Sequence, residues 1–370
     1  MRLLVLMSVL VGFAAILWLG KRPRVQVVEK LFSEYDYIVV GSGSGGGAVA
    51  ARLSENETFI ILLLEAGPED TDFYYSHIPA TSFDLQTTPF DWHYVTVPQE
   101  HCCENLQNRQ QKWPRGRGLG GCSTTNSMHY VRGNRHDYDR WEKEFKNPGW
   151  NYENVLPYFK KLENMQIDRF KHSSYHNVGC PVTVSEGVRT RLGDLYIQAA
   201  KALGYDVVAD PNGVSQEGFN RAYFNIKNGK RQSTAECYVR PAMRRNNFHV
   251  LPHAHVTKVL IESTNGGHRA VGVEYVHGNV RHSVRARREV ILSAGAINSP
   301  KILMHSGIGP KEHLERLGIP VLIDNPAVGS NLNDHPYSYI VFAVDESMAE
   351  IDVRATPTSR PSWWPRKQPI

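Results

Sequence analysis

Residues 35–67 read YDYIVVGSGSGGGAVAARLSENETFIILLLEAG, and this stretch decides the fold. The apolar run Tyr35–Val40 predicts a buried strand, a glycine-rich turn follows it, Ala48–Leu53 predicts a helix, and Phe59–Leu64 predicts a second strand. An acid, Glu65, follows the second strand directly. Strand, turn, helix and strand in this order are typical of the βαβ unit of a Rossmann-like α/β domain.

The glycine turn fits the pattern GxGxxG of dinucleotide-binding proteins at Gly41, Gly43 and Gly46. Gly41 allows the sharp turn, Gly43 lets backbone N–H groups approach a pyrophosphate, and Gly46 lets helix and strand pack closely. The N-terminus of the helix attracts phosphate through its dipole and its free N–H groups, Ser44 in the turn before it is counted among the cofactor-binding residues, and Glu65 can bond a ribose hydroxyl. We therefore predict a dinucleotide site here, although the turn alone does not separate NAD from FAD.

Composition and charge narrow the function classes. The chain has 370 residues, 41% of them apolar, so it can bury a large core. The formal charge of +5 is spread along the chain, and the richest basic cluster, Arg281–Arg288, alternates with apolar positions like an exposed strand face. We therefore expect no nucleic-acid partner. The five cysteines fit neither a zinc pattern nor a CxxC pair, so no metal site is expected, and a disulfide from Cys102 or Cys103 stays open without a named partner.

The N-terminus carries a targeting pattern. Leu3–Leu19 is apolar apart from Ser8 and Gly12 and is flanked by basic residues. Its length of about 17 residues fits a signal peptide and a membrane anchor equally well, so residues 1–24 are assigned to one or the other. Both alternatives send the chain into the secretory pathway, as an extracellular or a single-pass membrane protein.

Periodicity predicts further elements after residue 150. One helix is expected at Tyr152–Leu162 with Asn151 as the cap, and another at about 189–203 with Leu192, Leu195, Ala199 and Leu203 inward. A third should run from the capping box Ser233–Glu236 to about Arg245. A short fourth helix should begin with the N-cap Ser299 and Pro300 and end at Gly307. Strands are expected at Phe248–Leu251, Val256–Glu262, Ala270–Val276 and Arg281–Leu292. The dinucleotide unit is thus joined by later strands, with a helical insert at about 150–230.

Three more blocks accompany the glycine turn. Residues 116–133 read GRGLGGCSTTNSMHYVRG, residues 295–309 read GAINSPKILMHSGIG, and residues 328–335 read VGSNLNDH. Together with EAG at 65–67, these blocks resemble the glucose–methanol–choline (GMC) family of flavoprotein oxidoreductases, and within it the FAD- and quinone-dependent glucose dehydrogenases of insects. The resemblance covers about residues 35–343. Cys122 and Thr125 depart from the family pattern, in which a small residue and an aliphatic residue are usual.

The resemblance implies a fold, a cofactor and an activity. The fold is an α/β fold, an FAD-binding Rossmann-like βαβ domain with an inserted, incomplete α+β substrate domain. The cofactor is FAD, and the activity is oxidation of CH–OH donors, a sugar or another alcohol, with hydride passing to flavin N5 and electrons to a quinone-like acceptor. By resemblance Asn126, Ser127, Met128 and His129 lie against the flavin, Cys122 and Trp92 lie nearby, Val256 meets the adenine through its backbone, and Gly118, Ala294 and Gly295 complete the cofactor-binding set.

The end of the chain departs from the family. The family's catalytic histidine lies in a C-terminal third that we expect beyond residue 370, so no catalytic residue is predicted here. Residues 345–370 are rich in Pro, Arg and Trp and lack periodicity, so we expect an atypical, disordered tail. Two hypotheses follow, an FAD-dependent alcohol or sugar dehydrogenase and a non-catalytic truncated form that binds at most FAD or a partner. We interpret His335, Arg132, His253 and His255 as structural or surface groups.

Overall fold

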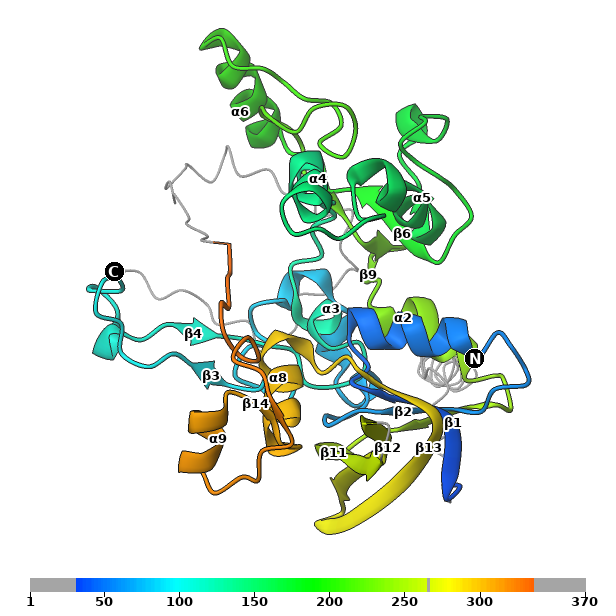
Figure 1. Cartoon of the computed structure of the whole chain (residues 1–370). Helices are drawn as coiled ribbons and strands as arrows, with labels where there is room; N and C mark the ends of the chain where they lie inside the picture. The colour runs from blue at the N-terminus through cyan, green and yellow to red at the C-terminus, as the bar shows by residue number, and fades with distance from the viewer. Residues whose placement is uncertain (1–30, 265–266, 336–370) are drawn as a thin grey trace, which may run out of the picture. The chain divides into compact units, whose positions relative to one another are not determined.

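The computed structural model describes residues 31–264 and 267–335 (Figure 1). The predicted signal peptide or membrane anchor at 1–24 and the predicted tail at 345–370 lie outside these residues, so the secretory location stays a prediction. Within the described part of the chain, no helix is long and apolar enough to cross a membrane. The chain divides into two compact units. The first comprises the described residues up to Ser127 together with Arg231–Asn333, and the second comprises Met128–Lys230 with Asp334 and His335.

The first unit is built on a six-stranded sheet with the order β10-β2-β1-β13-β12-β11. Its strands are β1 (Glu34–Val40), β2 (Ile61–Leu64), β10 (Phe248–Leu251), β11 (His255–Thr264), β12 (Gly267–His277) and β13 (Val280–Leu292). The first part of β13 pairs antiparallel with β12, and its last part pairs parallel with β1. The long, curved β13 therefore joins a parallel half, β10-β2-β1, to an antiparallel meander (Figure 1).

Both faces of the parallel strands are buried. Ile38 and Leu62 belong to a core that includes residues of β11, β12 and β13, whereas Val39 and Leu63 belong to a core that includes residues of helix α2 (Ser44–Leu53). Neighbouring residues of a strand point to opposite faces of the sheet. Since each face meets a core, β2 is apolar at every position, which is typical of a parallel strand covered on both sides.

The first unit also contains further helices, two short strand pairs and several 3₁₀ turns. They are the helices α3 (Cys122–Thr125), α7 (Arg240–Ala242), α8 (Gly295–His305) and α9 (Lys311–Arg316), the strands β3 (Tyr94–Val95), β4 (Lys112–Trp113), β14 (Ile308–Gly309) and β15 (Ile323–Asp324), and 3₁₀ turns at Asp70–Asp72, Tyr74–His77, Pro79–Thr81 and Gln107–Arg109. β3 and β4 form an antiparallel pair. Cys102 and Cys103, between these two strands, are both free thiols.

Two expected helices differ from the prediction. Instead of one helix from Ser233 to about Arg245, a π-helical turn (Ala235–Val239) leads into α7. Pro241 has no N–H to donate to the preceding turn, so the regular α-helical ladder is interrupted there. The helix expected to start at Ser299 begins four residues earlier, at Gly295, and contains Pro300 in its interior. Asn298, before the proline, and Ile302, after it, are the buried residues of this helix.

The second unit is a small α+β unit. Its helices are α4 (Arg135–Lys143), α5 (Tyr152–Leu162) and α6 (Arg191–Ala202), with a 3₁₀ turn at Asp168–Phe170. A three-stranded sheet consists of β5 (Glu163–Met165), β6 (Val182–Glu186) and β7 (Tyr223–Phe224). A separate pair, β8 (Ile226–Lys227) and β9 (Lys230–Arg231), follows where the chain passes from the second unit to the first. The prediction for α5 is confirmed, including the cap, because the Asn151 side chain accepts from the Asn154 N–H (3.0 Å). The inward face predicted for α6 is wrong: Leu192, Leu195, Ala199 and Leu203 are exposed and only Ala200 is buried.

A buried charge network stabilises the second unit. The guanidinium of Arg132 contacts Glu163 (3.0 Å), and the ring of His176 lies between Glu163 (3.0 Å) and Asp210 (2.9 Å). Arg132 is therefore a structural group, as expected. Burial opposes the charged form of His176, but its hydrogen bonds to Asp210 and Glu163 outweigh burial and raise the pKa of His176. When protonated, the ring and the Arg132 guanidinium together balance the charge of the two carboxylates.

Candidate cofactor site

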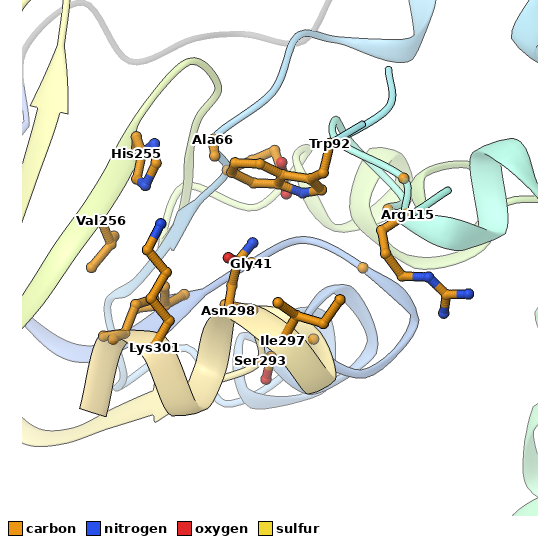
Figure 2. Close-up of a pocket in the computed structure, with 18 of the residues that line it drawn as sticks. Gly41, Ala66, Trp92, Arg115, His255, Val256, Ser293, Ile297, Asn298 and Lys301 are labelled. Atoms are coloured by element: carbon orange, nitrogen blue, oxygen red, sulfur yellow. The ribbon is translucent and has the colours of Figure 1, made fainter. Parts of the chain in front are cut away.

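A cavity of about 450 Å³ opens in the first unit at the carboxyl ends of the parallel strands. Its walls come from residues 40–41 at the end of β1, 64–66 at the end of β2, 254–257 around the start of β11 and 293–298 after β13. Open α/β sheets bind ligands at this edge. Figure 2 shows Trp92 and Ala66 along one side of the cavity and Ser293 and Ile297 along the other.

The glycine turn forms one wall of the cavity. Gly41 has φ +96°, and a Cβ there would lie 2.5 Å from the carbonyl oxygen of Ser293. A Cβ on Gly46 would lie 1.9 Å from the carbonyl oxygen of Gly41, so the helix can approach the turn only as glycine. Beside Gly43 the situation differs, since the nearest atom to an added Cβ is the Gly121 Cα at 3.9 Å. The turn is therefore tight where the backbone folds and open where a ligand is predicted.

The N-terminus of α2 is suited to an anion. Gly43 precedes the helix and offers no side-chain cap, and the first turn contains no acidic residue. The first N–H groups of a helix have no partner within the helix, and the helix dipole makes this end positive. Gly43, Ser44 and Gly45 also line the cavity. The helix start can therefore bind a phosphate group that enters the cavity.

Glu65 is buried in the wall and connects three segments. One carboxylate oxygen accepts from the Gly67 N–H (2.9 Å) and the Gly118 N–H (3.1 Å). The other accepts from the N–H (3.0 Å) and the hydroxyl (2.7 Å) of Ser42. The carboxylate thus ties the glycine turn to its own strand end and to the second glycine-rich block. Its predicted bond to a ribose hydroxyl stays a prediction.

Aromatic groups form another wall. The ring of Trp92 stacks on Tyr94, with centroids 5.9 Å apart and an interplanar angle of 2°, and the Arg117 guanidinium lies 5.4 Å from the Trp92 centroid. The hydroxyl of Tyr94 donates to Asn298 (2.7 Å), and His255 meets Trp92 edge-on at 5.6 Å. These contacts fix an aromatic platform at the cavity.

Basic side chains give the cavity a positive character. Lys301 and Arg115 line it at opposite ends of the view in Figure 2, and His255 lies near Lys301. Burial, followed by the charges of Lys301 and Arg117, lowers the pKa of His255, so this imidazole is neutral at neutral pH. Two permanent cations and a free helix N-terminus favour an anionic ligand such as a diphosphate.

The structure brings together nine of the residues predicted from sequence. Those lining the cavity are Gly41, Gly43, Ser44, Glu65, Trp92, Cys122, Val256, Ala294 and Gly295. Gly46 acts in packing, and Gly118 donates to Glu65. Asn126 and Ser127 belong to the same unit outside the lining, and Met128 and His129 belong to the second unit. The role of each residue toward a cofactor stays a prediction.

Sequence reasoning missed several lining residues. Tyr94, Arg115, Asn298 and Lys301 line the cavity, and so does His255, which was expected to be a surface or structural group. Arg115 directly precedes the second glycine-rich block, and Lys301 lies within the block at 295–309. Their nearness to these blocks is the sequence signal that could have indicated both residues. The direction of a side chain from α8 or β11 depends on tertiary packing, which a single sequence does not reveal.

One group of potential metal ligands occurs among the described residues of the first unit. The ligand atoms of Asp70, His77 and Glu236 lie within 4.8 Å of one another. Arg240 forms ion pairs with both carboxylates, to Asp70 and to Glu236 (2.8 Å). A guanidinium therefore already supplies the positive charge that a metal ion would bring, and we assign no metal to this group.

Comparison with known proteins relates this geometry to a family. The family model described as GMC oxidoreductase matches residues 35–337. An oxygen-dependent choline dehydrogenase of Pseudomonas savastanoi pv. phaseolicola is 41% identical over 324 residues, which is 86% of this chain and 55% of that protein. The crystal structure of a pyridoxine 4-oxidase from Mesorbium loti has a TM-score of 0.72 and 32% identity, covering 79% of this chain and 55% of that one.

A solved FAD-dependent oxidoreductase from Chaetomium thermophilum is similar to the same extent, with a TM-score of 0.71 and 32% identity over 79% of this chain and 51% of that one. The chain thus spans about half the length of the curated relatives it matches. The predicted FAD-binding α/β fold and FAD as the cofactor of this fold are confirmed by these matches. The chain belongs to the GMC oxidoreductase family.

Proposed function

We propose that the protein is an FAD-binding oxidoreductase that acts on CH–OH donors, a sugar or another alcohol, and delivers electrons to a quinone-like acceptor. The observation that carries the proposal is convergence on one cavity. The glycine turn, the second glycine-rich block through Gly116, Gly121 and Cys122, and the block that begins at Gly295 all line it, although they are far apart in sequence. A nucleotide loop without a ligand would not need all three.

The residues of the cavity fit the parts of FAD. The N-terminus of α2, with Arg115 and Lys301 as nearby cations, would hold the diphosphate. Ala66 and Val256 offer small and apolar surface to the adenine, and Trp92 offers a ring face. When bound, FAD supplies the acceptor of hydride at N5 and the route of electrons to a second acceptor. The protein groups bind and orient the cofactor and exclude water.

The substrate class rests on the relatives. Choline and pyridoxine, named for two of the similar proteins, are both alcohols. A sugar, another alcohol and the quinone-like acceptor are the finer parts of the proposal, and they follow from the resemblance of the sequence blocks. A binding-only protein, which holds FAD or a partner without turnover, is the alternative.

The test is purification of the chain from residue 25 onward and its absorbance spectrum, in which bound flavin gives bands near roughly 370 and 450 nm. A preparation that neither retains nor takes up FAD contradicts the proposal. Bound flavin that no alcohol bleaches under anaerobic conditions favours the binding-only alternative.

Gly43→Val provides a matched variant for the location of the site. A Cβ added at Gly43 meets only the Gly121 Cα, at 3.9 Å, so the backbone does not exclude a side chain there, and that side chain enters the region predicted for the diphosphate. We expect FAD affinity to fall at least tenfold with unchanged thermal stability of the flavin-free chain. Unchanged FAD affinity would place the cofactor elsewhere.

A further inference from the structure

Arg231 is a buried cation without a carboxylate partner. Its exposed fraction is 1%, and no acidic side chain of the described residues lies within ion-pair distance of it. Burial lowers the pKa of Arg231 to about 10, so the guanidinium remains protonated at neutral pH. Removing a charged group from water costs several kcal/mol, and here no opposite charge offsets that cost. Packing alone therefore does not explain an arginine at this position.

The guanidinium is instead surrounded by oxygen atoms of two segments. Nε donates to the carbonyl of Ser76 (2.9 Å) and Nη2 donates to the hydroxyl of Ser82 (3.0 Å). Nη1 donates to the carbonyl of Ser123 (3.2 Å) and to both the carbonyl (2.6 Å) and the side-chain oxygen (2.9 Å) of Asn126. Three of the five bonds thus go to the segment that contains α3, and two of them fix one residue, Asn126.

This segment adjoins the cofactor cavity. Cys122 lines the cavity, and its carbonyl accepts from the Asn126 N–H (2.9 Å). The carbonyl of Asn126 points at Arg231, and the carbonyl and N–H of a trans peptide point in opposite directions. The N–H of Ser127 is therefore directed away from the guanidinium. Within the described residues no acceptor for this N–H is found, so it is available to a ligand.

We propose that Arg231 is a positioning residue of the flavin site, which holds the Asn126–Ser127 peptide so that the Ser127 N–H is presented to a carbonyl oxygen of the flavin ring. The inference rests on the proposed function, because it needs FAD as the ligand. The charge of Arg231 lies behind this donor and is not neutralised by a carboxylate. Reduction adds negative charge to the flavin, and a nearby cation favours the form that carries more negative charge. Arg231 thus orients the donor and raises the tendency of the flavin to be reduced.

Three variants separate these effects. Arg231→Met removes both charge and donors, and Arg231→Lys keeps the charge but loses the planar fork that bonds several oxygens at once. Arg245→Met is the matched control, because Arg245 also donates to a carbonyl, Ala51 (2.6 Å), and a hydroxyl, Ser54 (2.7 Å), and within the described residues makes no hydrogen bond to α3 or Asn126. Two quantities are measured: hydrogen exchange of residues 122–127 in the flavin-free chain, and the midpoint potential of the FAD-loaded chain.

We expect exchange of residues 122–127 to be at least tenfold faster in Arg231→Met than in the wild type and in Arg245→Met. We expect the two-electron reduction equilibrium of the bound flavin to shift at least tenfold toward the oxidised form, which corresponds to about 30 mV. Arg231→Lys should recover most of the potential while its exchange remains fast.

Exchange in Arg231→Met equal to that of Arg245→Met would overturn the positioning role, and an unchanged potential would overturn the role of the charge. If Arg231→Met does not fold, Arg231→Lys decides the positioning role through exchange alone. A wild-type chain that takes up no FAD refutes the proposed function, whereas exchange in the flavin-free chain still decides whether Arg231 fixes the Asn126–Ser127 peptide.

Discussion

The carboxylate of Glu65 is the group on which the geometry of the glycine turn most depends, and Glu65→Gln changes it with almost no change in shape. The substitution replaces one of two oxygens by an NH₂ group and removes the negative charge. Each oxygen accepts two hydrogen bonds, from the N–H groups of Gly67 and Gly118 on one side and from the N–H and hydroxyl of Ser42 on the other. An NH₂ group cannot accept from any of these donors.

The least costly placement puts the NH₂ group beside Ser42, because the hydroxyl can turn and become an acceptor. The Ser42 N–H is then buried without a partner, which costs about 1–3 kcal/mol. The bonds from Gly67 and Gly118 change from charge-assisted to neutral, which costs about 1 kcal/mol each. We therefore expect Glu65→Gln to lower the free energy of unfolding of the first unit by about 3–5 kcal/mol, a large part of a domain's typical 5–15 kcal/mol.

Equilibrium unfolding in urea measures this loss, and hydrogen exchange of β1 and β2 assigns the transition to the first unit. Glu55→Gln is the control, since Glu55 pairs only with Arg52 (2.9 Å) and both side chains are 44% exposed. The control should change stability by less than about 0.5 kcal/mol. A loss below about 1 kcal/mol for Glu65→Gln would show that the carboxylate does not hold the turn together.

Gly46→Ala should lower the free energy of unfolding in urea by about 3 kcal/mol or more, because its Cβ would lie 1.9 Å from the Gly41 carbonyl oxygen. In the control Gly45→Ala the added Cβ meets nothing within 4 Å, so stability should be unchanged or rise by up to about 1 kcal/mol. Equal losses in the two variants would refute the packing argument. The raised pKa of His176 predicts that its contribution to the second unit is complete below its unfolded pKa, about 6.5, and is lost as pH rises through the folded value. Unfolding measured from pH 6 to 9 should thus show falling stability in the wild type and a flatter profile in His176→Asn, and a parallel profile would contradict it.

Features that depend on local backbone chemistry could be predicted from the sequence. Phe248–Leu251 has the predicted bounds, because this mostly apolar stretch ends directly before Pro252. Gly41 and Gly46 have the predicted roles in turning and packing, since the positions that must lack a Cβ are dictated by the turn itself. The start of α2 was placed at Ala48 and lies at Ser44, because glycines have low helix propensity and the sequence pattern counts them as turn.

Features that depend on contacts between distant segments could not be predicted. Arg231 looks like one more charged residue in a polar stretch, and its five hydrogen bonds reach residues between 76 and 126. The leucines of α6 are the converse case, because their helical spacing predicts burial and they are exposed. A 3.6-residue periodicity gives a helix one apolar face, but it does not establish which surface that face meets.

The two roles considered for Glu65 are connected through its hydrogen-bonding capacity. An ionised carboxylate offers about four lone-pair sites, and four protein donors already occupy them. A ribose hydroxyl can therefore bond Glu65 only if it replaces one of these donors. The Ser42 hydroxyl is the donor that can rotate away at least cost, because the other three are backbone N–H groups fixed by the turn and by the second glycine-rich block. The acid after β2 thus acts first as the bond between the two glycine segments, and any role toward the nucleotide depends on the freedom of one serine hydroxyl.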